Sequence, residues 1–316
     1  MRISLSVVRP FDPWQNPLCT CPLKYGLNPY TGCGHSCLYC YITSYIPDAF
    51  NPRPKEGLLE KVRRDLEKIP RGSVVALSNS SDPYTPPEAR LGLTRKILQI
   101  LLERGYRVLI TTKSPLVLRD LDILQRHREK VVVQITITTL REDLAAALEP
   151  KAPRPSGRLE AVRRLAAAGI PVAVRLDPII PLLTDDEHNI AEVIKAAAEA
   201  GAVQLVASTY KAKRDNFARL VKAFPDKAPL WRRLYFEDGK YFHGQWYASE
   251  AYRRRVLALA AGHARRLGLQ FTICREEFLE LNTPGTYCDG SHLLQKAEST
   301  EGTQNSGVPH AEGRYS

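Results

Sequence analysis

The sequence predicts an α/β fold, namely a partial (β/α)6 barrel of the TIM type with an N-terminal extension and an irregular α+β C-terminal region. Short apolar runs alternate with amphipathic segments between residues 56 and 207, which is typical of parallel strands joined by crossover helices. No G-x-G-x-x-G follows the first strand, so a dinucleotide-binding sheet is disfavoured. Five predicted strands after residue 41 and one before it make six, which suits the partial barrel.

The predicted strands are apolar runs bounded by turn residues. They cover residues 73–78, 107–112, 131–138, 170–176 and 202–207. The predicted helices place apolar residues three and four positions apart. They cover residues 56–69, 87–104, 116–127, 142–148, 158–168 and 185–200. Because chemistry in such barrels lies at the carboxyl ends of the strands, polar residues there are candidate site residues, and Thr136, Thr138 and Arg175 are among them.

Composition divides the chain into four parts. These are an N-terminal extension at 1–27, the barrel at 28–210, a C-terminal region at 211–296 and a tail at 297–316. Four prolines prevent a long helix in the extension, and the tail is rich in Ser, Gly, Thr and Glu, so we expect it to be disordered. The C-terminal region is predicted to hold a hairpin with an Asp238-Gly239 turn, a basic helix at 250–267 and a strand at 269–273.

Charge and apolar content restrict the class of protein. The formal net charge is +11 over 316 residues, which favours a polyanionic partner such as nucleic acid. A solvated basic surface is the alternative explanation. No apolar run is long enough to span a membrane, and residues 1–10 lack the apolar core of a signal peptide. We therefore expect a cytoplasmic protein without a membrane partner.

The most informative stretch is residues 28–41, which holds Cys33, Cys37 and Cys40 at the spacing C-x3-C-x2-C. Glycines and other turn-forming residues surround the cysteines, so this loop can wrap a compact object. Three thiolates suit a [4Fe–4S] cluster and leave its fourth iron open to another molecule. A zinc site with His35 as the fourth ligand is the rival interpretation.

The spacing, followed by an aromatic residue, resembles the signature of the radical S-adenosylmethionine (SAM) superfamily. Residues 28–205 more closely resemble one subgroup, spore photoproduct lyase and its DNA repair photolyase-like relatives. The resemblance rests on the cysteine motif and on short stretches at residues 80–84, 92–95, 111–114, 118–120, 135–139 and 148–150. It implies reductive cleavage of SAM at the cluster, hydrogen abstraction by a 5′-deoxyadenosyl radical, and a reductant such as ferredoxin or flavodoxin.

The resemblance also implies roles for single residues. Lys113 matches a lysine that contacts the SAM carboxylate, and Thr136 matches a hydroxyl residue near the same group. The segment Ser80, Ser81 and Asp82 falls where the family binds the methionyl end of SAM. The alternative is that these are ordinary polar residues at the ends of strands.

The same comparison implies roles near the radical. Tyr39 and Tyr41 match aromatic residues that pack over the adenine or lie near the radical path. Asn79 stands where spore photoproduct lyase has a hydrogen-donating cysteine, and an amide is a poor hydrogen-atom donor. The resemblance therefore implies radical initiation with a different substrate.

Four cysteines remain outside the motif, and they are Cys19, Cys21, Cys274 and Cys288. An auxiliary iron–sulfur cluster, a zinc site, a disulfide and unrelated buried thiols are all consistent with the sequence. The functional hypothesis is a radical SAM enzyme acting on nucleic acid, with the basic helix and the neighbouring Trp246 and Tyr247 as candidate contacts. The alternatives are the same chemistry on a peptide or small metabolite, and an iron–sulfur nucleic-acid-binding protein that does not cleave SAM.

Overall fold

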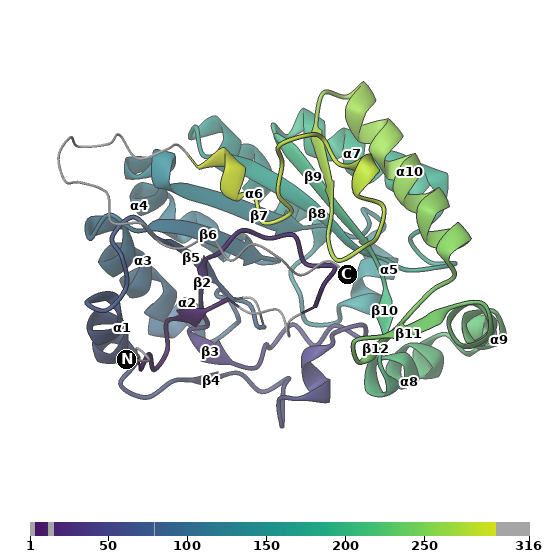
Figure 1. Ribbon diagram of the computed structural model, residues 1–316, viewed down its shortest axis with the longest axis horizontal. Helices are drawn as coiled ribbons and strands as arrows, with labels where there is room; N and C mark the ends of the chain where they lie inside the picture. Colours follow the sequence, from purple (N-terminus) through teal and green to yellow (C-terminus); the bar gives the residue numbers. More distant parts are fainter. Residues whose placement is uncertain (1–3, 12–15, 79, 295–316) are drawn as a thin grey trace, which may run out of the picture.

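An eight-stranded sheet forms the centre of the protein, for which a computed structural model describes residues 4–11, 16–78 and 80–294 (Figure 1). Its strands, in spatial order, are β1 (Arg9–Pro10), β2 (Tyr25–Leu27), β5 (Val74–Leu77), β6 (Arg107–Thr112), β7 (Val131–Thr136), β8 (Val172–Ile179), β9 (Gln204–Thr209) and β13 (Gln270–Ile273). All neighbours from β2 to β13 are parallel, and β1 is antiparallel at the edge. The predicted partial barrel is confirmed, and β13 adds a seventh parallel strand.

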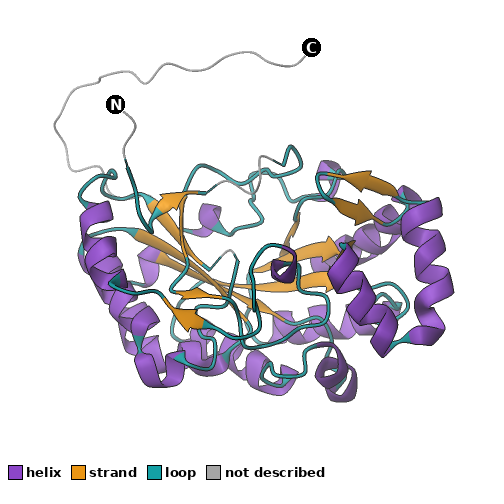
Figure 2. Cartoon of the chain, turned by 90° about the horizontal axis from the view of Figure 1, so that it is seen from below, coloured by secondary structure: helices purple, strands orange, loops and turns teal. Residues whose placement is uncertain are grey.

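Helices cover the outer side of the curved sheet, while loops cross its open side (Figure 2). The helices along the barrel are α1 (Leu58–Leu66), α2 (Glu88–Leu91), α3 (Leu93–Glu103), α4 (Leu121–Arg126), α5 (Glu142–Leu148), α6 (Pro155–Ala167), α7 (Glu187–Glu199) and α10 (Glu250–Arg266). The apolar side chains of α5 pack with the cysteine loop. The C-terminal region adds α8 (Arg214–Ala223), α9 (Ala228–Arg232) and a small sheet of β10 (Lys211–Ala212), β12 (Gln245–Tyr247) and β11 (Lys240–Phe242). A two-stranded sheet, β3 (Tyr30–Thr31) with β4 (Arg53–Pro54), supports the cysteine loop.

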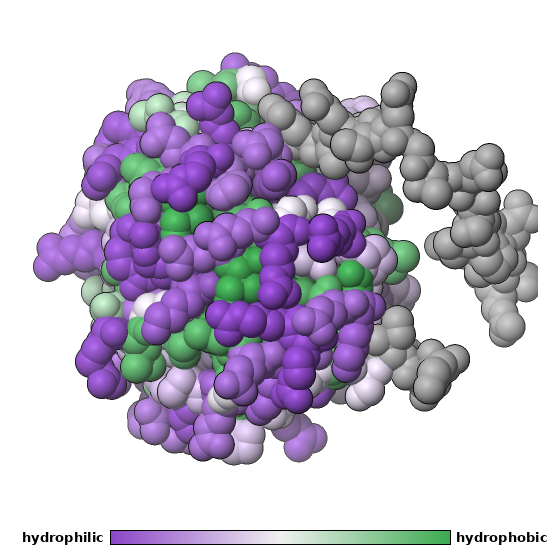
Figure 3. All heavy atoms as spheres, turned by 90° about the vertical axis from the view of Figure 1, so that its left-hand side faces the viewer, coloured by the Kyte–Doolittle hydropathy of each residue, from purple (hydrophilic) through white to green (hydrophobic). Residues whose placement is uncertain are grey.

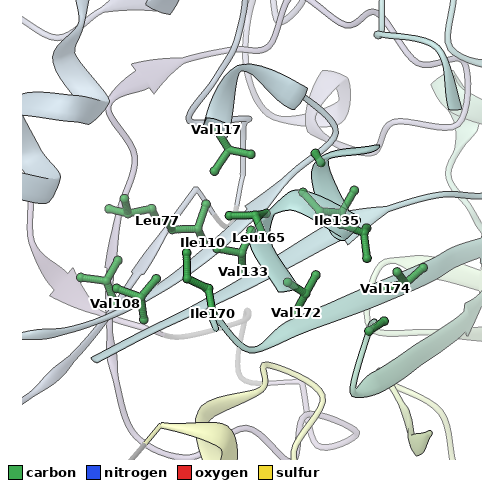
Figure 4. Packing of buried hydrophobic residues seen from close by; sticks show 14 of the residues in the cluster. Leu77, Val108, Ile110, Val117, Val133, Ile135, Leu165, Ile170, Val172 and Val174 are labelled. Atoms are coloured by element: carbon green, nitrogen blue, oxygen red, sulfur yellow. The ribbon is translucent and has the colours of Figure 1, made fainter. Parts of the chain in front are cut away.

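Alternation along the strands separates an apolar outer face from a polar inner face. In β7, Val133 and Ile135 are fully buried in the main core, as Figure 4 shows, whereas Gln134 and Thr136 line the inner hollow. Arg175 of β8 lies beside Thr136 in the parallel register and also lines this hollow. The helices thus stabilise one face of the sheet by burying it, and the other face is left for polar groups.

Two predicted helices differ from those observed. The helix predicted at 87–104 divides into α2 and α3 at Gly92, whose φ of +61° lies in the left-handed region that ends a helix. The helix predicted at 116–127 begins as a 3-10 turn over Pro115–Asp120 and becomes α-helical only at α4. Both differences lie at the end of a helix, where the spacing of apolar residues does not distinguish an α-helix from a turn.

The predicted Asp238-Gly239 hairpin turn is wrong. The hairpin joins β11 and β12 instead, and its turn is His243-Gly244, where both φ values are positive. Gly239 has another reason to be glycine, since a Cβ there would lie 2.3 Å from the carbonyl oxygen of Tyr247. The tail predicted to be disordered lies outside the described residues.

The basic helix α10 packs against α7 and β13, so it is a covering element of the barrel. Arg253 is fully buried and its guanidinium pairs with Glu276 and Glu277 at 2.9 and 2.7 Å. Arg254 pairs with Glu280 at the surface. The hypothesis that this helix grips phosphates through its arginines is therefore not supported for these two residues. Tyr247 is buried as well, so it is not available to stack a base.

The surface is mainly hydrophilic on the side shown in Figure 3, with groups of hydrophobic residues between the hydrophilic ones. None of the helices in the described part of the chain is long and apolar enough to cross a bilayer.

The main core makes a testable contribution to stability. Leu165 of α6 is 0 % exposed in this core, so Leu165→Ala should lower the free energy of unfolding by about 2–5 kcal/mol through lost burial and an added cavity. Leu230→Ala is the matched control, because Leu230 is 57 % exposed and should change stability little. Urea denaturation followed by circular dichroism measures both, and equal effects would contradict this assignment of the core.

Candidate active site

A cavity of about 700 Å³ opens on the inner face of the sheet, on the side of the carboxyl ends of the strands. The cysteine loop forms one wall, and Thr111, Gln134, Thr136 and Arg175 form the floor. This volume is within the usual range for sites that hold a cofactor or small ligand.

The cysteine loop is held by backbone contacts with distant segments. The amide of Cys33 donates to the Ala49 carbonyl at 2.7 Å, and that of Leu38 donates to the Leu148 carbonyl at 2.9 Å. Gly32 is required here, because its φ is +86° and a Cβ would lie 2.6 Å from the Ala49 oxygen. The sequence thus dictates a fixed loop that turns its cysteines toward the cavity.

All three cysteines of the motif line the cavity, and their chemistry fits a cluster ligated by thiolates. Burial raises the pKa of Cys33 and Cys40, and that of Cys37 to about 12. The free thiols are therefore protonated at neutral pH, and a bound metal would displace those protons. His35 is buried beside Asp82, with its Nδ1 3.5 Å from the carboxylate, and it lines the cavity together with the three cysteines.

The Asp82 carboxylate connects the cysteine loop to strand β6. It accepts hydrogen bonds from the Thr112 hydroxyl at 2.6 Å, the Lys113 amide at 2.8 Å and the Tyr84 amide at 2.8 Å. Asp82 is only 5 % exposed, and its oxygens are occupied by these donors. Its observed contacts are thus those of a residue that positions Lys113.

A buried charged group lies behind the cluster loop. The Tyr39 hydroxyl donates to the carboxylate of Glu149, and Glu149 pairs with the Arg158 guanidinium. Burial alone would raise the pKa of Glu149, but Arg158 and Lys113 lower it, so the carboxylate is ionised. Burial, together with this carboxylate, raises the pKa of Tyr39 well above its usual value. Tyr39 is therefore a hydrogen-bond donor at neutral pH.

Lys113 follows β6 and directs its ammonium group over the Tyr39 ring, 5.5 Å from the centroid, at the cavity wall. Burial alone would lower its pKa, but Cys37 and Glu149 outweigh this effect and raise it. The amine therefore stays charged and can bind a carboxylate in the cavity.

The other predicted cofactor-binding residues occupy different positions. Ser80, Ser81 and Thr136 line the cavity, and the amide of Ser80 and the hydroxyl of Ser81 contact Asn28 and the Tyr30 carbonyl at 3.4 and 3.3 Å. Thr138 is buried next to Glu149 and is not among the residues that line the cavity.

Arg175 lies in the cavity but is directed toward the C-terminal segment. Its guanidinium donates to the Cys288 carbonyl at 3.1 Å and pairs with Asp177 at 2.5 Å. Tyr41 also lines the cavity, under the guanidinium of Arg275 at 5.7 Å. Asn79 lies outside the described residues, so its predicted place near the radical stays a prediction.

Cys19, Cys21, Cys274 and Cys288 line the same cavity, because two distant parts of the chain meet there. The sulfur atoms of Cys21 and Cys288 are 3.5 Å apart, although 267 positions separate the residues. The interaction with the Cys288 thiol lowers the pKa of Cys274 to about 6, although burial acts in the opposite direction.

Two supporting residues were missed in the sequence. Arg158 pairs with Glu149, and Arg219 of α8 donates to the carbonyls of Leu38 and Cys40 at 3.0 and 2.7 Å. The Glu149-Pro150 motif was a signal for the first, since a buried carboxylate needs a partner. Nothing local in the sequence marks Arg219, which reaches the loop from 179 positions away.

The buried ion pair leads to a prediction. Arg158→Met leaves the Glu149 carboxylate buried without its cation and should lower the free energy of unfolding by about 3–5 kcal/mol. Arg163→Met, on the same helix, is the control: it removes an exposed pair with Glu160 and should change stability little. Denaturant titration measures both variants. If Arg158→Met were as mild as the control, Glu149 would not be ionised in the folded protein.

Comparison with known proteins now identifies the family. The model of the radical SAM superfamily matches residues 27–203, more than half of the chain. The uncharacterized protein ORF301 of Acidianus two-tailed virus is 30 % identical over 236 residues, which cover 69 % of this chain and 77 % of that protein. The uncharacterized protein Rv2578c of Mycobacterium tuberculosis is 28 % identical over 258 residues, covering 76 % and 74 % of the two chains.

Solved structures of spore photoproduct lyase share the fold. The complex with dinucleoside spore photoproduct superposes with a TM-score of 0.60 at 19 % identity, covering 78 % of this chain and 76 % of that one. A mutant of the same enzyme with bound AdoMet and dinucleoside spore photoproduct gives 0.59 at 18 % identity, covering 78 % and 75 %. At this level of identity the likeness shows the fold alone. The matched family model, the partial barrel and the cysteine loop together show that the chain belongs to the radical SAM superfamily.

Proposed function

We propose that this protein cleaves SAM reductively at a [4Fe–4S] cluster held by Cys33, Cys37 and Cys40, and uses the radical to abstract hydrogen from a nucleic-acid substrate. The observation that carries the proposal is the convergence of three thiols and the charged Lys113 on one cavity. When bound, a reduced cluster supplies the electron that divides SAM into methionine and a 5′-deoxyadenosyl radical.

Residues of the chain have separate tasks in this proposal. The Lys113 ammonium binds the carboxylate of SAM, and Asp82 fixes Lys113 through its backbone amide. The hydroxyl groups of Ser81 and Thr136 offer neutral hydrogen-bonding partners at the same wall. Tyr41 and the enclosed walls exclude water from the radical, which prevents side reactions.

An anionic substrate is supported by the charges on the cavity wall. The wall carries seven lysines and arginines but three aspartates. Arg9 and Lys55 lie among them, and burial together with Arg9 lowers the pKa of Lys55, as expected where like charges gather. Such a surface attracts phosphates. The shared fold with spore photoproduct lyase, solved with a dinucleoside, points the same way.

The proposal includes the surroundings of the reaction. Enzymes of this superfamily need an external reductant, and we expect a ferredoxin or flavodoxin to supply the electron. An oxygen-sensitive cluster of this kind is consistent with a reducing, cytoplasmic location.

SAM cleavage tests the core of the proposal. Reconstituted protein, reduced without oxygen and mixed with SAM, should yield 5′-deoxyadenosine, and Cys37→Ala should abolish both the product and the cluster absorbance. Lys113→Met should weaken SAM binding roughly 10- to 100-fold, since a charge-assisted contact contributes about 1.5–3 kcal/mol. Lys96→Met, on the exposed face of α3, is the control and should bind SAM normally. Wild-type protein that holds the cluster but gives no 5′-deoxyadenosine would contradict the proposal.

Salt dependence tests the nucleic-acid substrate. The affinity for tRNA or DNA should fall with salt, and Arg9→Gln with Lys55→Gln should reduce the slope of log K against log salt by about two. The control pair is Arg163→Gln with Lys195→Gln, two exposed positions on outer helices. Fluorescence anisotropy measures both. Salt-independent binding, or equal effects of the two pairs, would favour a peptide or small metabolite as substrate.

A further inference from the structure

We propose that Cys19, Cys21, Cys274 and Cys288 form a second metal centre, a site in which four thiolates bind one tetrahedral ion of the zinc class. This centre is separate from the cluster loop, and it does not depend on the function proposed above. The four cysteines are named below as the quartet, and the motif cysteines as the triad.

The first observation is that the four cysteines of the quartet line one cavity. Cys19 and Cys21 meet Cys274 and Cys288 there, and the sulfur atoms of Cys21 and Cys288 are 3.5 Å apart. The two pairs come from opposite ends of the chain. A convergence of four thiols over such a separation is poorly explained as apolar packing alone, because all four line a cavity that also holds Lys24, Arg175 and Asp177.

The second observation is that the backbone around the quartet is fixed. The amide of Cys274 donates to the Ala207 carbonyl at 3.0 Å and so extends the pairing of β13 with β9. The Cys288 carbonyl accepts from Gln134 at 2.9 Å and from Arg175 at 3.1 Å. The backbone that carries these two ligands is therefore fixed, which favours a metal site.

Spacing distinguishes the kind of metal. Zinc–sulfur bonds of about 2.3 Å in a tetrahedron place neighbouring sulfurs roughly 3.8 Å apart, close to the 3.5 Å observed between Cys21 and Cys288. The spacing of this one pair therefore fits two ligands of a tetrahedral ion.

The described residues contain no group of three or more His, Cys, Asp or Glu side chains already converging on one metal-binding point. This statement holds for the triad as well as for the quartet. Both sets therefore have to draw their sulfurs inward around the metal that they bind.

Charge in the surroundings suits thiolates. The Lys24 ammonium, with a side chain 2 % exposed, pairs with Asp289 at 2.7 Å and interacts with Cys21. Arg175 and Arg275 act on Cys274 from the other side. Four thiolates around a divalent ion carry two net negative charges. These cations, two of which also pair with Asp289 and Asp177, offset part of that charge.

A disulfide is the main rival. All seven cysteines are free thiols in the structure, and 3.5 Å is far beyond the bond length of about 2.05 Å. A metal site also explains why Cys19 and Cys274 lie on the same cavity wall, whereas a Cys21–Cys288 disulfide would not.

Metal analysis separates these readings. The triad variant, Cys33→Ala with Cys37→Ala and Cys40→Ala, cannot hold the radical cluster, so its metal belongs to the quartet. We expect one zinc per chain without acid-labile sulfide, and X-ray absorption with four sulfurs at about 2.3 Å. One iron without sulfide would support the same site with another ion. In otherwise wild-type protein, Cys21→Ser with Cys288→Ser should lose this ion and keep the absorbance of the radical cluster.

Three results would overturn the proposal. They are a triad variant free of metal, an equal metal content with and without Cys21→Ser and Cys288→Ser, and four irons with sulfide in the triad variant, which would mean a second cluster in place of a single ion. Thiol counting under denaturing, non-reducing conditions detects the disulfide. Because the triad variant is itself measured, the test stands even where the serine variant fails to fold. SAM cleavage is not used as a readout, so failure here leaves the proposed function untouched.

Discussion

A single buried carboxylate, that of Asp82, connects the parts on which the site depends. It faces His35 in the cysteine loop and accepts hydrogen bonds from Thr112 and the Lys113 amide at the end of β6. Hydrogen bonds to a buried charged group are stronger than those between neutral groups, and leaving such a group unsatisfied is costly. One side chain therefore links the loop that carries the thiols to the strand that carries the ammonium group.

The local architecture could be predicted from the sequence, because short-range patterns determine it. Strand 107–112 and helix 142–148 were predicted with the observed limits, since apolar periodicity and flanking turn residues mark both. The prediction failed at residues whose type fits two different structural roles. Gly239 resembles a turn glycine but serves a close backbone approach, and Arg253 resembles a surface arginine but is buried against Glu276.

The sequence predicted which residues belong to the site better than it predicted which residues they contact. The triad and Lys113 were identifiable from spacing and resemblance, and the structure brings them to one cavity. Tyr39 is instead held by Glu149, and Arg175 is directed to the Cys288 carbonyl. Such partners come from distant parts of the chain, and a single sequence carries no signal for which distant residues meet. The convergence of the quartet was hidden for the same reason.

The meeting of Cys21 with Cys288 also sets an order of events during synthesis. A ribosome adding 5–20 residues per second needs roughly 13–53 s to make the 267 positions between them. Every strand from β2 to β9 is complete before the last of these positions emerges. The contact between Cys21 and Cys288 therefore cannot form until the strands that line the rest of the cavity have been synthesised.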